Sequence, residues 1–408
     1  MTTPTTELRA LLEHRSFVRF WIARLTGGFA NQMQAVAVGW QMYALTGSAL
    51  DLGLVGLVQF APSLALLLLV GHVADRYDRR RVLALCQLVD ASATTTLAVL
   101  SLRGTITPHA IFALVALIGA ARAFTLPTQQ TLVPALVPAA LLPRAIAASS
   151  TAGQTAIVAG PALGGFLYAA GPAVVYALCA TLQIAASTLN ATLAIERRVP
   201  SREPTTLSTL FAGIGYIRRR RELLGAISLD LFAVLFGGAA ALFPIYARDI
   251  LYTGPWGLGL LRSAPAVGAL TMALWLAHHP IERHAGRKMF AAIALFGAAT
   301  IVFGLSRSFA LSIATLVVLG AADMVNVVVR MSLVQLRTPD EMRGRVSAVN
   351  AMFIGASNQL GEFESGVTAA WFGTVPAVVL GGVGTLVVAG LWMRWFSELK
   401  EVDSLSNG

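Results

Sequence analysis

The sequence has little charge for its length and almost no lysine. Of its 408 residues, 12% are charged and 56% are hydrophobic, whereas about a quarter of the residues in a typical soluble domain are charged. Lys288 and Lys400 are the only lysines, and arginine supplies the rest of the 30 basic side chains. This composition excludes an ordinary soluble domain and predicts an all-α protein that crosses a membrane many times.

Several kinds of chemistry lack the residues that they need. The two cysteines, Cys86 and Cys179, lie in apolar runs without metal or redox spacing, and the six histidines form no ligand cluster. No Gly-x4-Gly-Lys-Ser/Thr motif is present, which argues against ATP hydrolysis by this chain. The sequence shows no nucleophile elbow or zinc-ligand spacing either. We therefore expect no catalytic residues, no metal and no cofactor.

The apolar residues form twelve runs, each long enough to cross about 30 Å of hydrocarbon as a helix. The predicted spans are 19–45, 50–73, 82–102, 108–130, 143–170, 173–194, 223–248, 256–277, 288–305, 309–331, 342–370 and 374–396. Arginines concentrate in the loops on one side, and the other side has only Arg103, Arg248 and Arg307. Because basic loops stay in the cytoplasm, both termini are predicted to be cytoplasmic. Basic residues spread over loops between apolar runs also argue against nucleic acid as a partner.

A short charged turn separates the second and third predicted spans, with the sequence GHVADRYDRRR. It resembles the signature loop of the major facilitator superfamily of secondary transporters through Gly71, Asp75, Arg76, Arg79 and Arg80. Asp78 stands where the family pattern has a second glycine. The resemblance implies that this loop is a gating motif that latches the two halves of the transporter on the cytoplasmic side. The alternative is a topology anchor made of snorkelling arginines.

The two halves of the chain repeat. An offset of 201 residues places Gly119 on Gly320, Gly160 on Gly361 and Gly165 on Gly366. The superfamily resemblance implies two parallel six-helix repeats, the major facilitator fold, with a substrate site between them. The predicted segments are an N-terminal segment, two bundles, a linker between them and a tail, at 1–18, 19–194, 223–396, 195–222 and 397–408.

The linker contains apolar residues at helical spacing from Leu207 to Ile217, followed by four arginines, Arg218–Arg221. This pattern indicates an amphipathic helix on the inner membrane surface, with its arginines toward anionic lipids. A solvated linker helix is the alternative.

Two further stretches strengthen the family resemblance. Gly160, Pro161, Gly164 and Gly165 resemble the core of a Gly-Pro-x-x-Gly-Gly motif of drug and proton antiporters, although close helix packing would also explain them. Residues 336–346 and 358–366 are similar to the branch that includes bacterial enterobactin exporters. The branch implies a bacterial cytoplasmic membrane as the location.

Ionisable residues within spans are costly and are therefore candidates for function. These candidates lie in seven of the predicted spans. They are Arg24 in span one, Asp90 in span three, Arg122 in span four, Asp230 in span seven, Arg262 in span eight, Asp323 in span ten, and Glu362 and Glu364 in span eleven. Gln34 in span one is a further, uncharged candidate. The superfamily lines a central cavity with spans one, four, seven and ten. The resemblance therefore implies a cavity with a basic N-terminal wall and an acidic C-terminal wall, faced by Arg122 and Asp323.

We expect different roles for these side chains. Arg122 can bind an anionic substrate group or tune a neighbouring carboxylate, unless it forms a structural ion pair with Asp323. Asp323 is the first candidate for a proton carrier, and Glu362 is another. Arg24 and Asp230 can instead snorkel from the inner end of a span. Gln34 can contact an amphipathic substrate or make hydrogen bonds between helices.

The leading functional prediction is a proton-coupled exporter of small amphipathic organic molecules, such as siderophores or drugs. Its partners would be the substrate, protons and membrane lipids. An inward transporter of a nutrient or organic anion is the alternative. A membrane enzyme or a sensor without transport activity is more remote, because neither an enzyme motif nor an additional soluble domain is present.

Overall fold

The computed structural model describes residues 11–66, 69–70, 73, 77–194 and 207–403, and no strand occurs in these ranges. Gly71, Asp75 and Arg76 of the charged turn lie outside the described residues, as do linker residues 195–206. The helices of the first half are α2 (Arg15–Thr46), α3 (Ala49–Ala65), α5 (Arg79–Leu102), α6 (Pro108–Leu136), α7 (Leu142–Tyr168) and α8 (Pro172–Ala191). The protein is therefore all-helical over the part that the structure describes.

The helices of the second half follow the same pattern, with a short helix before and after them. They are α9 (Leu207–Arg219), α10 (Arg221–Gly237), α11 (Phe243–Ile245), α12 (Gly254–His278), α13 (Ala285–Leu305), α14 (Phe309–Leu336), α15 (Asp340–Phe372), α16 (Thr374–Trp395) and α17 (Ser397–Lys400). Eight helical segments among the described residues are long and apolar enough to cross a membrane. The long helices α2 and α15 are not among the eight, because both carry many amide and charged side chains.

The predicted seventh span is irregular. Helix α10 ends at Gly237, and one turn of 3-10 helix, η2 (Ala239–Leu242), precedes α11 and a π-helical turn, η3 (Tyr246–Ile250). A Cβ atom on Gly238 would lie 2.7 Å from the carbonyl carbon of Gly361. The break therefore coincides with a close approach to α15 that glycine alone permits.

The chain divides into two compact units. The first comprises residues 1–45, 58–204 and 255–259, and the second comprises 46–57, 205–254 and 260–408. Each unit thus includes the N-terminal end of one helix from the opposite half of the sequence, α12 in the first and α3 in the second.

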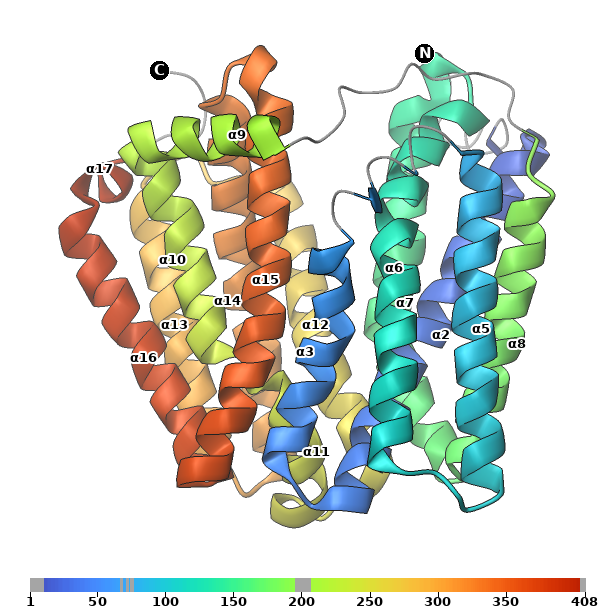
Figure 1. Ribbon diagram of the computed structural model, residues 1–408. Helices are drawn as coiled ribbons and strands as arrows, with labels where there is room; N and C mark the ends of the chain where they lie inside the picture. The colour runs from blue at the N-terminus through green and yellow to red at the C-terminus, as the bar shows by residue number, and fades with distance from the viewer. Residues whose placement is uncertain (1–10, 67–68, 71–72, 74–76, 195–206, 404–408) are drawn as a thin grey trace. The chain divides into compact units, whose positions relative to one another are not determined.

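In the first unit, α5 packs against both α6 and α8 (Figure 1). Polar bonds fasten α5 to α8: the Ser187 hydroxyl donates to the Ala84 carbonyl at 2.7 Å, and the Asn190 amide donates to Gln87 at 2.8 Å. Gly164 of α7 lies against the backbone of α2, since its Cβ would be 2.7 Å from the Met33 Cα. The Gly-Pro motif therefore packs helices here, with Gly160 against Gln32, and Pro161 and Gly165 against Gly259.

In the second unit, α13 packs against α14 and α16, and α10 packs against α15 and α16. The predicted linker helix is α9, and it lies across the end of α15 (Figure 1). Ile217 of α9 is buried in the core, whereas Phe211 is 67% exposed. One side of α9 therefore packs against the protein core. Phe211 and the exposed arginines do not take part in this packing and can contact another surface.

Val402 and Asp403, near the C-terminus, cap the N-terminal end of α13. The backbone N–H groups of Ala285 and Gly286 donate to the carbonyls of Asp403 and Val402 at 3.1 and 3.0 Å. The Asp403 carboxylate accepts from the His284 N–H at 2.9 Å. These acceptors satisfy N–H groups that have no partner within the helix itself.

Each unit contains the same kinds of glycine contact and glycine turn, at positions that are 201 or 202 residues apart in the sequence. A Cβ on Gly119 would overlap the carbonyl oxygen of Gln59, and a Cβ on Gly320 would overlap that of Pro265. Gly171, before α8, and Gly373, before α16, both have positive φ, at 108° and 91°. These glycines hold equivalent positions because only glycine allows such close approach and such turns at low cost.

We expect Gly320→Ala to lower the free energy of unfolding by about 1–3 kcal/mol, because the added methyl group must displace the α12 backbone at Pro265. Thermal unfolding of the purified protein in detergent measures the effect. Gly390→Ala is the matched control, since no atom lies within 4 Å of the added group and alanine favours helix by about 0.5–1 kcal/mol. Equal stability of the two variants would contradict the close contact.

Asp78 explains the departure of the charged turn from the family pattern. It is the N-cap of α5 with φ −62°, an ordinary value for any residue, and its carboxylate accepts from the Arg80 N–H. It also forms a 2.7 Å ion pair with the Arg80 guanidinium. That hydrogen-bonded guanidinium lowers the pKa of Asp78. Arg80 and Arg79 further donate to the carbonyls of Leu193 and Thr131, at 2.6 and 3.4 Å.

We expect Asp78→Ala to reduce the unfolding free energy by about 1 kcal/mol through loss of the cap. Since the pKa of Asp78 is lower in the folded state, its charge stabilises the fold above the ordinary aspartate pKa of about 3.9. That contribution is lost as the pH falls through the folded-state value. Unfolding curves of the wild type and Asp78→Asn from pH 7 to pH 3 measure it, and a gap that widens on acidification would disprove the assignment.

Candidate functional site

A cavity of about 290 Å³ lies within the first unit and is lined by residues of α2, α5, α6, α7 and α8. Small residues create the space, among them Gly27 and Gly28 on α2 and Gly153 and Ala156 on α7. The polar and ionisable side chains that line it are Arg24, Asn31, Gln32, Cys86, Gln87, Asp90, Arg122, Thr125, Gln129 and Gln183. A concave space with several convergent polar groups is typical of a small-molecule site.

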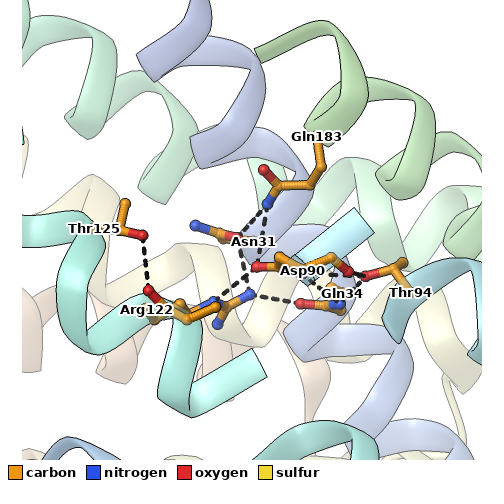
Figure 2. Close-up of polar contacts among 8 residues, drawn as sticks. Asn31, Gln34, Asp90, Thr94, Arg122, Thr125 and Gln183 are labelled. Carbon is orange, nitrogen blue, oxygen red and sulfur yellow. Dashed lines mark hydrogen bonds and ion pairs between the residues drawn. The ribbon is translucent and has the colours of Figure 1, made fainter. Parts of the chain in front are cut away.

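Arg122 lies in this cavity, and its guanidinium binds within its own unit (Figure 2). Its Nε lies 3.4 Å from Oδ2 of Asp90 on α5. Its Nη2 donates to Oδ1 of Asn31 at 2.9 Å and to Oε1 of Gln34, both on α2. One carboxylate and two amides therefore bind the Arg122 guanidinium. Of the two expected roles, this arrangement corresponds to interaction with a neighbouring carboxylate.

Asp90 is the buried centre of this network and is 3% exposed. Gln34 donates to Oδ1 at 3.3 Å, and Gln183 donates to Oδ2 at 3.4 Å and to Asn31 at 2.7 Å. The Thr94 hydroxyl also lies beside Gln34 and Asp90 (Figure 2). A buried ion pair of this kind is stable only when the remaining lone pairs are also satisfied, as they are here.

Gln34 is 3% exposed and joins α2 to α5 and α6, which corresponds to the expected alternative of hydrogen bonds between helices. Asp90 was named only as an ionisable residue of span three and was given no role, yet it is the partner of Arg122. The signal was present in the sequence, because Gln87, Asp90 and Thr94 share one face of α5 at spacings of three and four residues.

Arg24 lines the same cavity from α2, and its surroundings are unlike those of Arg122. Among the described residues, no acceptor lies within hydrogen-bonding distance of its guanidinium and no carboxylate within ion-pair distance. The facing residue on α7 is Gly153, where an added Cβ would lie 3.6 Å from Nη2 and 3.8 Å from Nε of Arg24. Arg24 thus supplies a positive charge that the described part of the protein does not neutralise.

The second unit contains a similar buried ion pair. Arg330 Nη1 on α14 lies 3.4 Å from Oδ2 of Asp230 on α10, and the two side chains are 3% and 5% exposed. Asn326 donates to Asp230 at 2.6 Å, and Arg330 donates to Asn350 of α15 at 2.9 Å. The snorkelling alternative is therefore wrong for Asp230, because its charge is balanced inside the unit by an arginine to which the sequence assigned no role.

Asp323 lies on α14 three residues before Asn326, so the two share a helix face. Among the described residues, no basic side chain lies within 4.0 Å of its carboxylate. Each unit therefore has a buried pair of Asp and Arg. Arg24 in the first unit and Asp323 in the second lie outside these pairs, and the expected basic and acidic walls of a central cavity stay a prediction.

Glu362 and Glu364 of α15 make separate contacts, as their spacing predicts. A Cβ on Gly56 of α3 would lie 2.8 Å from Oε2 of Glu362, and Glu362 interacts electrostatically with Arg262 of α12. Glu364 instead accepts a 2.7 Å hydrogen bond from the Thr368 hydroxyl. Of the two glutamates, Glu362 therefore contacts α3 and interacts electrostatically with the basic residue Arg262.

Comparisons with known proteins identify the family. The model of the transmembrane secretion effector family matches residues 6–407. The chain belongs to this branch of the major facilitator superfamily. It is 21% identical over 396 residues to the macrolide efflux protein A of Streptococcus pyogenes, which covers 95% of this chain and 97% of that protein. It is 24% identical to the enterobactin exporter EntS of Citrobacter koseri, with 96% and 94% covered.

Solved structures show the same fold. A bacterial homologue of the human lysosomal transporter Spinster, inward-facing and unoccupied, superposes with a TM-score of 0.75 at 14% identity over 95% of this chain and 98% of that one. Its membership of the transmembrane secretion effector family makes the protein a multi-pass membrane transporter and not an enzyme.

We expect Asp230→Ala to lower the free energy of unfolding by about 3–5 kcal/mol, because it leaves Arg330 buried without a counter-ion. Adding Arg330→Met should restore most of that loss, since the unpaired charge is then removed as well. Thermal and denaturant unfolding in detergent test this pair of variants. A double variant no more stable than Asp230→Ala would mean that the ion pair does not account for the loss.

Proposed function

We propose that the protein is a proton-coupled exporter that moves small amphipathic organic molecules by alternating access. The observation that carries the proposal is the cavity of the first unit, in which amides, a threonine and two arginines line a space among helices of a membrane transporter. Amide groups and apolar walls suit substrates that combine polar and apolar parts. The printed names of the relatives, a macrolide efflux protein and an enterobactin exporter, favour export of siderophore or drug-like molecules.

The transport mechanism requires twelve spans in two parallel six-helix repeats with both termini in the cytoplasm. Two observations support this arrangement. Helices lie in the ranges that the apolar runs predicted, and the glycine contacts of Gly119 and Gly320 recur at the same offset. The excess of arginine in alternate loops favours this orientation. The bacterial relatives favour a bacterial cytoplasmic membrane as the location. Membrane lipids are further partners, with α9 and its arginines at the inner surface.

Asp323 is proposed as the proton carrier. A carboxylate without a basic partner can gain and lose a proton without breaking an ion pair, whereas Asp230 cannot. Glu362 is the second candidate, with Arg262 as its basic neighbour. One proton moving across 100 mV contributes about 2.3 kcal/mol, so one or two protons can drive a useful substrate gradient.

The charged turn is proposed as the cytoplasmic gating motif. Arg79 and Arg80 fasten it to carbonyls at the ends of α6 and α8. Gly71, Asp75 and Arg76 are assigned to the same motif through the family resemblance alone.

An inward transporter of an organic anion is the alternative, favoured by the uncompensated charge of Arg24. Accumulation of a transported substrate in inverted compared with right-side-out vesicles distinguishes the two directions. A screen of siderophores, drugs and dyes in a strain without its own exporters supplies that substrate.

Asp323→Asn should abolish proton-driven accumulation of the substrate in proteoliposomes, while exchange of labelled for unlabelled substrate continues. The asparagine keeps the shape of the side chain but cannot carry a proton. Asp340→Asn is the matched control, because Asp340 is 83% exposed in the first turn of α15. Full coupling in Asp323→Asn would exclude Asp323 as the carrier.

A further inference from the structure

We propose that Arg24 binds the anionic group of the transported molecule, so that the cavity of the first unit takes a small organic anion or the anionic end of a larger one. This inference rests on the proposed transport function and names the substrate class for the same cavity. It moves the anion-binding role from Arg122, where the sequence suggested it, to Arg24.

The balance of charge in the cavity supports this assignment. Three charged side chains line it: Arg24, Asp90 and Arg122. Asp90 and Arg122 pair with each other, and both Asp90 carboxylate oxygens accept bonds from neighbouring amides. Arg24 is therefore the one charged residue of the cavity lining whose charge is not balanced within that lining. A half-buried guanidinium without a counter-ion is energetically unfavourable, and a bound anion would remove this cost.

Free donors distinguish Arg24 from Arg122. A guanidinium has five N–H donors and no acceptor. Arg122 directs its donors to Asp90, Asn31 and Gln34, whereas those of Arg24 have no acceptor among the described residues. An incoming carboxylate can therefore bind Arg24 without breaking an existing bond, but it must displace protein groups to bind Arg122.

Gly153 lies beside one edge of the Arg24 guanidinium and places no side chain against it. The atoms that an added Cβ on Gly153 would meet are Nη2 and Nε of Arg24, at 3.6 and 3.8 Å. These two nitrogens form one edge of the guanidinium, which binds a carboxylate through two parallel hydrogen bonds. Glycine at this position keeps the edge accessible, and a larger side chain would cover it.

The cavity sets the size of the ligand. Its volume of about 290 Å³ lies at the lower end of the range for small-molecule pockets, about 300–1,000 Å³. The amides of Gln32 and Gln129 line the same space and can bind further polar atoms. The cavity suits a molecule of the size of an aromatic carboxylic acid.

Ligand-dependent thermal stability of the full chain in detergent tests the proposal, with benzoate and the isosteric neutral benzamide as probes. We expect benzoate, but not benzamide, to raise the unfolding temperature of the wild type. Arg24→Gln should weaken benzoate binding about tenfold or more, as expected for loss of hydrogen bonds from a charged group. Arg24→Lys should retain part of the binding, because it keeps the charge but loses the two-bond geometry.

Two further variants separate binding from folding. Gly153→Val keeps the charge of Arg24 but covers its edge, and it should also weaken benzoate binding. Arg283→Gln removes an exposed arginine outside the cavity and should leave the affinity unchanged. The unfolding temperature of each variant without ligand shows whether it folds. Equal stabilisation by benzoate and benzamide, or unchanged benzoate affinity in Arg24→Gln, would overturn the proposal.

A lipid headgroup is the other source of an anion, and nanodiscs distinguish it. If phosphatidylglycerol stabilises the wild type but not Arg24→Gln relative to phosphatidylcholine, and benzoate has no effect, the site belongs to lipid and the proposal fails. Because binding needs no proton gradient, its outcome is independent of transport. Proton-coupled export without benzoate binding would refute the anion site alone, and benzoate binding without transport would refute the exporter alone.

Discussion

A buried ion pair in each unit is the constraint on which the remaining polar structure depends. Asp90 with Arg122, and Asp230 with Arg330, join helices that are distant in the sequence. Removing such charges from water is costly, and the cost is offset only when the pair is close and the other polar atoms find partners. The amides of Asn31, Gln34 and Gln183 supply such partners to the first pair. Those of Asn326 and Asn350 supply them to the second, where Nε of Arg330 has no hydrogen-bond partner among the described residues.

The two pairs decide which charges are available for function. A charge held by a neighbouring opposite charge can change its state only if the pair breaks, so the paired residues position their helices. Arg24 and Asp323 are outside the pairs, and they carry opposite signs in the two units. The paired residues are therefore assigned to structure. The two proposals, substrate binding by Arg24 and proton transfer by Asp323, concern charges that lie outside the pairs.

Glycine contacts are the second constraint. In a membrane the lipid tails are as apolar as the side chains, so helices associate largely through close packing and polar bonds. Gly119, Gly165, Gly320 and Gly366 all lie where an added Cβ would meet a neighbouring backbone. The sequence repeat is therefore maintained at positions where the backbone geometry tolerates no side chain, whereas the charged residues between them have diverged.

The class of the protein, its family and most of its helical ranges could be predicted from the sequence, although the break in the seventh predicted span could not. Apolar runs and turn glycines are local signals, and the cost of backbone polar groups in lipid leaves helices as the simple solution for such runs. Only the tertiary structure decided which charges meet, because pairing of Arg122 with Asp90 depends on how α5 and α6 face one another across 32 residues of sequence. The sequence suggested Arg122 as the residue that binds an anionic substrate group. It could not show that Asp90, on another helix, neutralises Arg122, because that contact forms only when the helices pack.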